Sequence, residues 1–211
     1  FMASPLFPEP PPHQAPTPLA EIDQMVEALE QKRRVWVETS MEDRIKLLEA
    51  CLDSTKNAAR EWVETGCRAK GVEEGTQQEG ELWFTGPVVL MRNLRLLVES
   101  LKWGGAMELP GWEERADGQQ VARVFPLDLN DKMFMPKVTG EVWIEPGKPT
   151  TQGALYRKKE AGDLGDGGTC LVLGAGNISG IGVQDAVHRL FHEDEVVIVK
   201  CNPVNDWVGP Q

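Results

Sequence analysis

The sequence predicts an α/β fold in which helices come first, short strands follow and a β-α-β unit comes last. Apolar residues recur at helical spacing between residues 19 and 104. Segment 105–168 instead holds short strand-like runs punctuated by Pro and Gly. Segment 169–211 reads as strand, glycine-rich turn, helix and strand. A proline-rich arm over residues 1–18 precedes these three parts.

The arm contains seven prolines in its eighteen residues, a density that excludes helix and favours an extended, polyproline-like chain. We expect a flexible lead-in, with docking into an aromatic groove as the alternative. The arm has neither the basic start nor the apolar run of a secretory signal. An intracellular protein, cytoplasmic by default, is therefore expected.

Segment 19–104 is predicted to form three helices. The apolar stripe of the first consists of Ile22, Met25, Val26 and Leu29. Ser40 and Asp43 form the S-x-x-D pattern of a helix start, so a second helix should begin there and end at Gly66 or Gly71. A third should run from about residue 79 to 102, kinked or delayed by Pro87.

Segment 105–168 is predicted to contain two strands, over Val121–Phe125 and Gly140–Ile144. The last segment is predicted to place a strand at Cys170–Leu173, a helix after the glycine-rich turn, and a second strand at Val196–Val199. Such a turn leads into a helix start whose N–H groups are unpaired and whose dipole favours anions. The turn is therefore a candidate site for the phosphates of a nucleotide.

The turn matches the dinucleotide-binding pattern G-x-G-x-x-G only in part. Gly174 and Gly176 fit its first two glycines, but Ser179 stands at the third. The second strand of that fold ordinarily ends near an acidic residue that accepts from a ribose hydroxyl. Lys200 stands there instead, and a lysine can donate to a ribose or meet a 2′-phosphate but cannot accept.

Taken together, Leu173–Asn177 and Val197–Lys200 resemble the aldehyde dehydrogenase superfamily. Asn177 and Lys200 stand where that family has an Asn and a Lys, at its usual spacing. The resemblance covers nearly everything after the arm, as the N-terminal part of a family chain. Two departures are that Ala175–Gly176 replaces the family's Pro-Trp and that Pro203 replaces its acid.

The resemblance implies a Rossmann-like, NAD(P)-dependent oxidoreductase that converts an aldehyde to a carboxylic acid. Its side-chain donor to the oxyanion would be Asn177, and its thiol nucleophile would lie in a downstream domain, so residues 1–211 alone are expected to be inactive. With no acid near the strand end, NADP should be accepted at least as well as NAD. The cofactor-binding residues that it implies are Leu173, Gly174, Ala175, Gly176, Lys200 and Asn202.

Several alternatives stay open at this point. Asn177 could simply cap the helix. The chain could be a non-catalytic relative that binds a nucleotide or serves as a scaffold, whereas Lys200 and the long helical prelude disfavour an ordinary Rossmann oxidoreductase. The strands of 105–168 could be oligomerisation strands, as the resemblance implies, or an ordinary sheet inside one subunit. A homo-oligomer, or association with the rest of a longer chain, is expected.

Composition excludes several classes of partner. The 22 basic and 33 acidic side chains give a formal charge of −11, which argues against binding of nucleic acid or anionic membrane. The four cysteines show no metal-ligand spacing and are expected to be free thiols. His188 and His192 share a helix face, but no third ligand is evident, so no metal is assigned.

Overall fold

A computed structural model describes residues 15–209, so most of the proline-rich arm lies outside the described residues. The fold is mixed α/β, as predicted, and helix outweighs strand at about 53% against 13% of the described residues. The described residues divide into two compact units, one formed by residues 15–99 and 158–209 and the other by residues 100–157. The first unit thus unites the predicted helical segment with the β-α-β unit.

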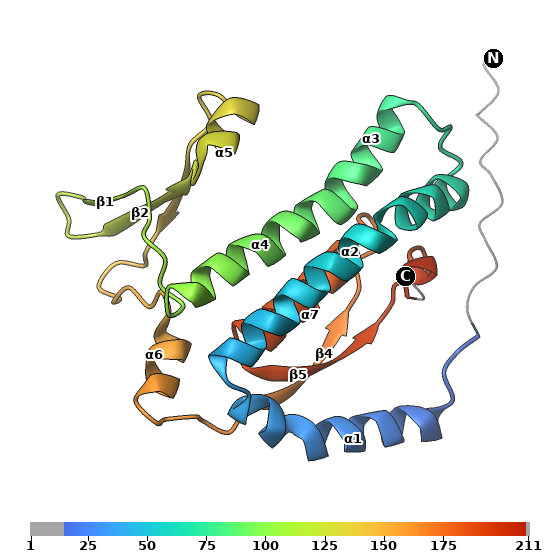
Figure 1. Cartoon of the computed structure of the whole chain (residues 1–211), viewed down its shortest axis with the longest axis horizontal. Coiled ribbons are helices and arrows are strands. Elements are labelled where there is room, and N and C mark those ends of the chain that lie inside the picture. Colours follow the sequence, from blue (N-terminus) through green and yellow to red (C-terminus); the bar gives the residue numbers. More distant parts are fainter. Residues whose placement is uncertain (1–14, 210–211) are drawn as a thin grey trace. The chain divides into compact units, whose positions relative to one another are not determined.

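The first helix begins where the sequence predicts, and the second begins and ends where the sequence predicts (Figure 1). Helix α1 spans Leu19–Glu38 and α2 spans Met41–Lys70. Ser40 caps α2, because its hydroxyl accepts from the N–H of Asp43 at 3.1 Å. Gly71 ends α2 in the left-handed conformation, with φ 63°.

The third predicted helix is broken in the middle, where the sequence places Pro87. Helix α3 covers Gln77–Trp83, a π-helical stretch η1 covers Phe84–Val88, and α4 covers Val89–Lys102. Gly86 has non-helical backbone angles and marks the kink. The kink arises because a proline inside a helix removes a hydrogen bond and clashes with the preceding turn.

The end of the chain forms a β-α-β unit with two parallel strands. Strand β4 spans Gly168–Leu173, α7 spans Ile181–Phe191 and β5 spans Glu195–Lys200. The strands are in register from Gly168 opposite Glu195 to Leu173 opposite Lys200. A short 3-10 turn, η2, follows at Asp206–Val208.

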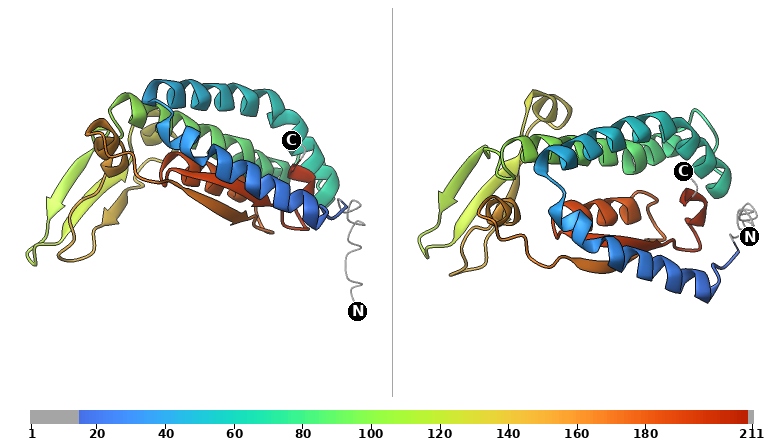
Figure 2. Two further views of the ribbon diagram at one scale, coloured as in Figure 1. Left: turned by 90° about the horizontal axis from the view of Figure 1, so that it is seen from below. Right: turned by 60° about the horizontal axis from the view of Figure 1, so that its bottom comes forward.

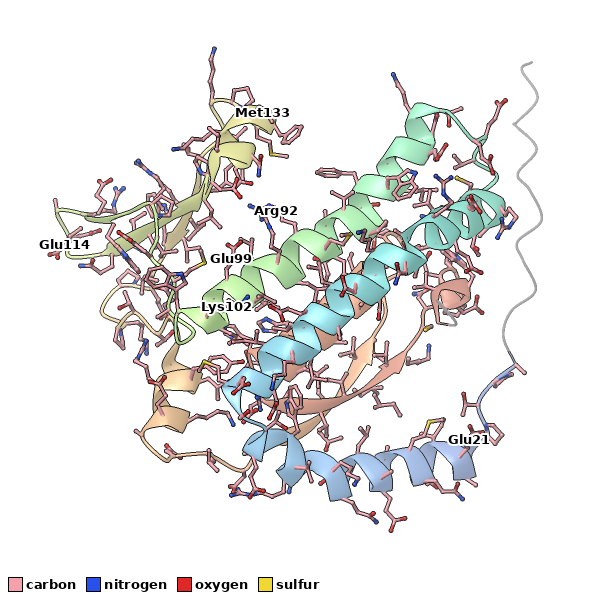
Figure 3. The ribbon with its side chains drawn as sticks, viewed as in Figure 1. Glu21, Arg92, Glu99, Lys102, Glu114 and Met133 are labelled. Carbon is pink, nitrogen blue, oxygen red and sulfur yellow. The ribbon has the colours of Figure 1, made fainter. Side chains whose placement is uncertain are left out.

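Two helices cover this sheet, with α1 on one side and α7 on the other (Figure 2). The Trp36 indole of α1 donates to the carbonyl of Leu190 at 3.0 Å and meets the Phe191 ring edge to face. The N-terminal end of α1 is more exposed, and Glu21 extends from it into solvent (Figure 3). The buried apolar side chains of unit 1 include Val37, Leu48, Val63, Leu90 and Leu94.

A buried ionic cluster fixes the turn between α7 and β5. Asp194 is 3% exposed and has a left-handed backbone, with φ 61°. Its carboxylate accepts from Arg44, at the start of α2, and from Lys159, in helix α6 (Ala154–Glu160). The corner between α1 and α2 is thereby tied to the beginning of β5.

The second unit is built on a three-stranded antiparallel sheet with β2 in the centre. Its strands are β1 (Gly111–Glu114), β2 (Gln120–Phe125) and β3 (Gly140–Trp143), and the short helix α5 covers Leu129–Phe134. The predicted strands correspond to β2 and β3, whereas β1 was not predicted. Several large apolar side chains of this unit are exposed, among them Met133 (Figure 3).

None of the helices found within residues 15–209 is both long and apolar enough to cross a membrane.

Candidate functional site

The turn between β4 and α7 presents a row of backbone donors. From Ala175 to Val183, no N–H group donates a hydrogen bond to any residue in the described range 15–209. The turn starts at Gly174, whose N–H donates to the carbonyl of Lys200 at 2.9 Å. Free N–H groups that lead into a helix start attract anions, because the helix dipole adds to them.

Three glycines allow this turn to lie close to its neighbours. A Cβ on Gly174 would come within 3.2 Å of the backbone at Asn202, and one on Gly176 within 3.2 Å of the Asn202 side chain. A Cβ on Gly182, in the first turn of α7, would lie 3.3 Å from the Cα of Gly174. Gly182 therefore permits the close approach of helix and strand that the third glycine of a dinucleotide-binding turn provides.

The side chain of Asn205 fixes the turn through hydrogen bonds to its backbone. Its side-chain amide donates to the carbonyls of Ala175 and Gly176, at 2.8 and 3.0 Å. Asn205 is 4% exposed, and its Oδ1 is buried without a hydrogen-bond partner in the described part of the chain. A buried acceptor without a donor costs free energy, so a group that donates to this oxygen would bind favourably.

The turn, the start of α7 and the end of β5 enclose a cleft of about 340 Å³. The cleft lies at the carboxyl edge of the parallel strands, where open α/β sheets bind ligands. Its lining combines the glycine turn with apolar side chains of α7 and β5 and with Asn205 at its base. The lining residues include Gly174, Ala175, Ser179, Cys201, Asn202 and Asn205.

Lys200 lines a second and larger cleft, of about 820 Å³, on the side of β5 that faces α1. Pro16, Thr17 and Ile22 form its other wall. Both clefts are lined by Val199, Cys201 and Gly209, so they meet around the end of β5. A ligand in the first cleft could reach the Lys200 ammonium only by passing this strand end.

The structure brings together most of the predicted site residues. Gly174, Ala175 and Asn202 line the first cleft, and Gly176 contacts Asn202 directly. Leu173 is an exception, because it is 65% exposed and lines a separate hollow beside Asp185 and His188. Leu173 shares the exposed face of β4 with Leu171, whereas Val172 between them is buried, as strand alternation requires.

Asn177 is exposed at the tip of the turn, and its side chain has no hydrogen-bond partner within residues 15–209. Helix α7 begins at Ile181, its N-cap is Gly180, and no side chain caps it. The alternative that Asn177 caps this helix is therefore wrong. Its amide is free to donate to a group outside the chain.

Two further contacts position the turn and were not predicted. The indole of Trp62, in α2, donates to the hydroxyl of Ser179 at 3.0 Å, and both residues are buried. A Cβ on Gly180 would lie 2.8 Å from the carbonyl oxygen of Thr85 in η1. The kinked stretch η1 is thus the surface on which the start of α7 rests.

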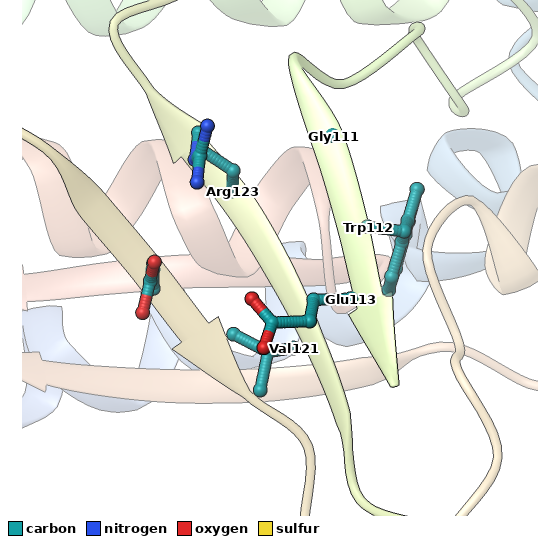
Figure 4. Close-up of a pocket in the computed structure, with 6 residues that line it drawn as sticks. Gly111, Trp112, Glu113, Val121 and Arg123 are labelled. Carbon is teal, nitrogen blue, oxygen red and sulfur yellow. The ribbon is translucent and has the colours of Figure 1, made fainter. Parts of the chain in front are cut away.

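Unit 2 carries a separate hollow of about 210 Å³ on its sheet (Figure 4). Arg123 of β2 lies opposite Glu141 of β3 in register, and Glu113 of β1 lines the same hollow. Opposite charges on neighbouring strands stabilise a sheet. We therefore regard this hollow as part of the sheet surface rather than as a reaction site.

All four cysteines are free thiols. Cys67 is buried in α2, and burial raises the pKa of its thiol. Cys201 is partly exposed and lines both clefts at the end of β5.

Comparison with protein-family models, with curated proteins and with solved structures gives no significant match.

Proposed function

We propose that this chain binds the phosphates of NAD or NADP at the turn between β4 and α7, as the cofactor-binding part of an aldehyde dehydrogenase-like oxidoreductase. The observation that carries the proposal is the cleft itself. Ala175, Ser179, Gly182 and Val183, whose N–H groups are free, line it together with Asn205, whose buried Oδ1 has no partner within residues 15–209. Backbone donors suit the pyrophosphate, and a buried acceptor suits a hydroxyl or amide of the cofactor.

The position of Lys200 at the end of β5 supports the proposal that the ligand is a nucleotide, whose ribose or 2′-phosphate would lie at this strand end. Its side chain lines the second cleft, which joins the first around Cys201. A dinucleotide whose phosphates occupy the turn could extend one end over this strand end. The Lys200 ammonium would then donate to a ribose hydroxyl or pair with the 2′-phosphate of NADP.

The test is calorimetric titration of the purified chain with NAD⁺ and with NADP⁺. Substituting Lys200→Met should weaken NADP⁺ more than NAD⁺, because a hydrogen bond to a charged group is worth roughly 1.5–3 kcal/mol. Lys56→Met, on the exposed side of α2, is the matched control and should leave both affinities unchanged. Equal losses would mean that Lys200 contacts only the shared ribose. Absence of binding to both cofactors would refute the site.

Asn177 is the proposed donor to the oxyanion formed when a thiolate adds to an aldehyde. The support is its exposed amide in the turn between β4 and α7, which has no hydrogen-bond partner within residues 15–209. In a protein that includes the nucleophile, Asn177→Ala should lower kcat by about 10²–10³, the loss typical of a missing oxyanion donor. Cofactor affinity should stay unchanged.

A non-catalytic nucleotide-binding or scaffold subunit is the second candidate, because the cleft, its backbone donors and Lys200 would all serve binding alone. The two candidates differ in one measurement. The scaffold binds the cofactor but shows no aldehyde-dependent formation of NAD(P)H in any form of the protein, whereas the enzyme shows it once the thiol is present.

We also propose that the sheet of unit 2 takes part in self-association. Trp112 and Val142 flank the small, buried Ala122 on one face, and each of the two is 48% exposed. Exposed apolar surface of this kind marks contact surfaces. Light scattering should show an oligomer that Trp112→Glu with Val142→Glu converts to monomer. A wild-type chain that is monomeric at all concentrations would contradict this.

A further inference from the structure

The end of α7 far from the glycine turn brings two imidazoles and a carboxylate together. His188 and His192 are one helical turn apart, and their rings stack with centroids 4.6 Å apart and planes 17° from parallel. Glu193 Oε1 lies 3.3 Å from His188 Nε2 and 3.3 Å from His192 Nδ1. One ligand atom from each of the three residues lies within 4.8 Å of the others. The third ligand, which the histidine spacing alone did not reveal, is thus Glu193.

These separations fit a tetrahedral metal ion. Zinc binds imidazole nitrogen and carboxylate oxygen at about 2.0–2.2 Å, so neighbouring ligand atoms of a tetrahedral site lie about 3.3–3.5 Å apart. The two nitrogen–oxygen separations of 3.3 Å already have this length. Both rings would have to turn out of their stacked arrangement, with planes 17° from parallel, for the two nitrogens to face one ion.

The backbone that carries the three ligands is firmly held. The N–H groups of His192 and Glu193 both donate to the carbonyl of His188, at 2.8 and 3.3 Å. Asp194, the next residue, is fixed in its left-handed conformation by its buried pairs with Arg44 and Lys159. Glu193 is therefore presented at one position beside the histidines, which lowers the entropy lost on binding an ion.

We propose that His188, His192 and Glu193 form a binding site for a borderline divalent cation of the Zn²⁺ class, with water as the fourth ligand. The three side chains are 51%, 67% and 42% exposed, so the ion has an entry path and a water can complete the tetrahedron. Neutral imidazoles and one carboxylate suit Zn²⁺, whereas Mg²⁺ and Ca²⁺ prefer oxygen ligands. The site would bridge the last turn of α7 to the start of β5, at the opposite end of the helix from the nucleotide cleft.

The test is titration of chelator-treated, tag-free protein with ZnSO₄ by calorimetry, with Co²⁺ absorption as the probe of geometry. We expect one Zn²⁺ per chain, a rise in melting temperature with Zn²⁺, and the intense visible absorption of tetrahedral Co²⁺. Because an outer-sphere partner alone is worth about 10–100-fold in metal affinity, Glu193→Gln should weaken binding by at least that factor. Replacing both histidines, as His188→Ala with His192→Ala, should abolish it. His13→Ala, which changes the only other histidine of the chain, is the matched control and should bind as the wild type does.

Protons should compete with the metal, because the imidazoles must be neutral to bind it. The charged neighbours are Asp185 and Arg189 on α7 and Glu195 on β5, with Arg189 and Glu195 paired at 3.4 Å. Affinity for Zn²⁺ should therefore fall as the medium is made acidic. Zinc binding that survives the double histidine variant, or that Glu193→Gln leaves unchanged, would overturn the three-ligand site. Absence of binding by the wild type would overturn it entirely.

Discussion

Arg44 and Asp194 form a buried ion pair in which Nη2 lies 2.5 Å from Oδ1 and the two side chains are 0% and 5% exposed. Lys159 binds the second oxygen of Asp194 at 2.6 Å. Arg44 also donates to the carbonyl of Trp36 at 2.6 Å and lies over its ring, 4.2 Å from the centroid. Three separate segments of the chain thus depend on one carboxylate.

Replacing Arg44 by Met should lower the free energy of unfolding by about 3–5 kcal/mol, because the buried carboxylate of Asp194 then keeps only one of its two cationic partners, Lys159. Urea unfolding followed by circular dichroism would measure the loss. Arg33→Met is the control, since Arg33 pairs with Glu30 at the surface, where such pairs are worth about 0–1 kcal/mol. Adding Asp194→Asn to Arg44→Met should recover part of the loss, because Asn tolerates the left-handed backbone. A loss no larger for Arg44 than for Arg33 would contradict the assignment.

Two glycine-to-alanine substitutions should change the free energy of unfolding in opposite directions. Gly180→Ala places a methyl group 2.8 Å from the backbone oxygen of Thr85, so we expect a loss of about 1–3 kcal/mol from overpacking. Gly80→Ala lies inside α3 with open space around it, and the lower backbone entropy of alanine should add about 0.5–1 kcal/mol. Melting curves of the two variants and of the wild type would measure both changes. Stabilisation by Gly180→Ala would show that α7 does not rest on η1.

Hydrogen bonds to Glu79, in the first turn of α3, should make the free energy of unfolding depend on pH. The N–H of Gly75 donates to Glu79, as does the indole of Trp83, and these bonds hold the pKa of the Glu79 carboxyl below its ordinary 4.5. A carboxyl whose pKa is lowered by folding stabilises the folded state above its unfolded-state pKa and loses that effect as the pH falls through its folded-state pKa. Glu79→Gln should therefore destabilise the chain at pH 7, and the difference from wild type should shrink below about pH 4.5. Unfolding curves between pH 3 and 7 would show it, and a difference that is constant with pH would exclude it.

Thiol reactivity should separate Cys51 from Cys67. Alkylation requires the thiolate, and burial raises the pKa of both thiols, so the expected difference rests on the shielding of Cys67, which is 3% exposed. Cys51 is exposed on α2. Iodoacetamide at pH 8 should label Cys51 in the folded chain and Cys67 only after unfolding, as read by mass spectrometry of peptides. Equal labelling rates in the folded chain would indicate that Cys67 is accessible.

The helices could be predicted because their signals are local. Ser40 and Gly71 fix the ends of α2, and Pro87 marks the break before α4. Strand β1 escaped prediction because it has four residues, and its Glu113–Glu114 end gives no apolar alternation. The short helix α5 escaped because six residues cover fewer than two turns, too few to establish a periodic stripe.

The glycine turn could be predicted from its spacing, but its support could not. Asn205 contacts carbonyls 29 and 30 residues earlier in the chain, and Trp62 reaches Ser179 across 117 residues. No local pattern records such a contact. Lys200 lines the cleft beside α1 and not the cleft at the turn. This placement likewise depends on how the helices cover the sheet, which no local pattern records.

Unit 1 is discontinuous, since residues 100–157 separate its two parts. The order of synthesis therefore matters for this chain. Unit 2 consists of one continuous segment and can fold as soon as it leaves the ribosome, whereas α1 and α2 must wait for Asp194 and β5 before their buried charge and apolar face are covered. Until then Arg44 and the inner side of α1 stay in contact with solvent. During synthesis these two helices therefore expose apolar surface until the last strand of the unit has been made.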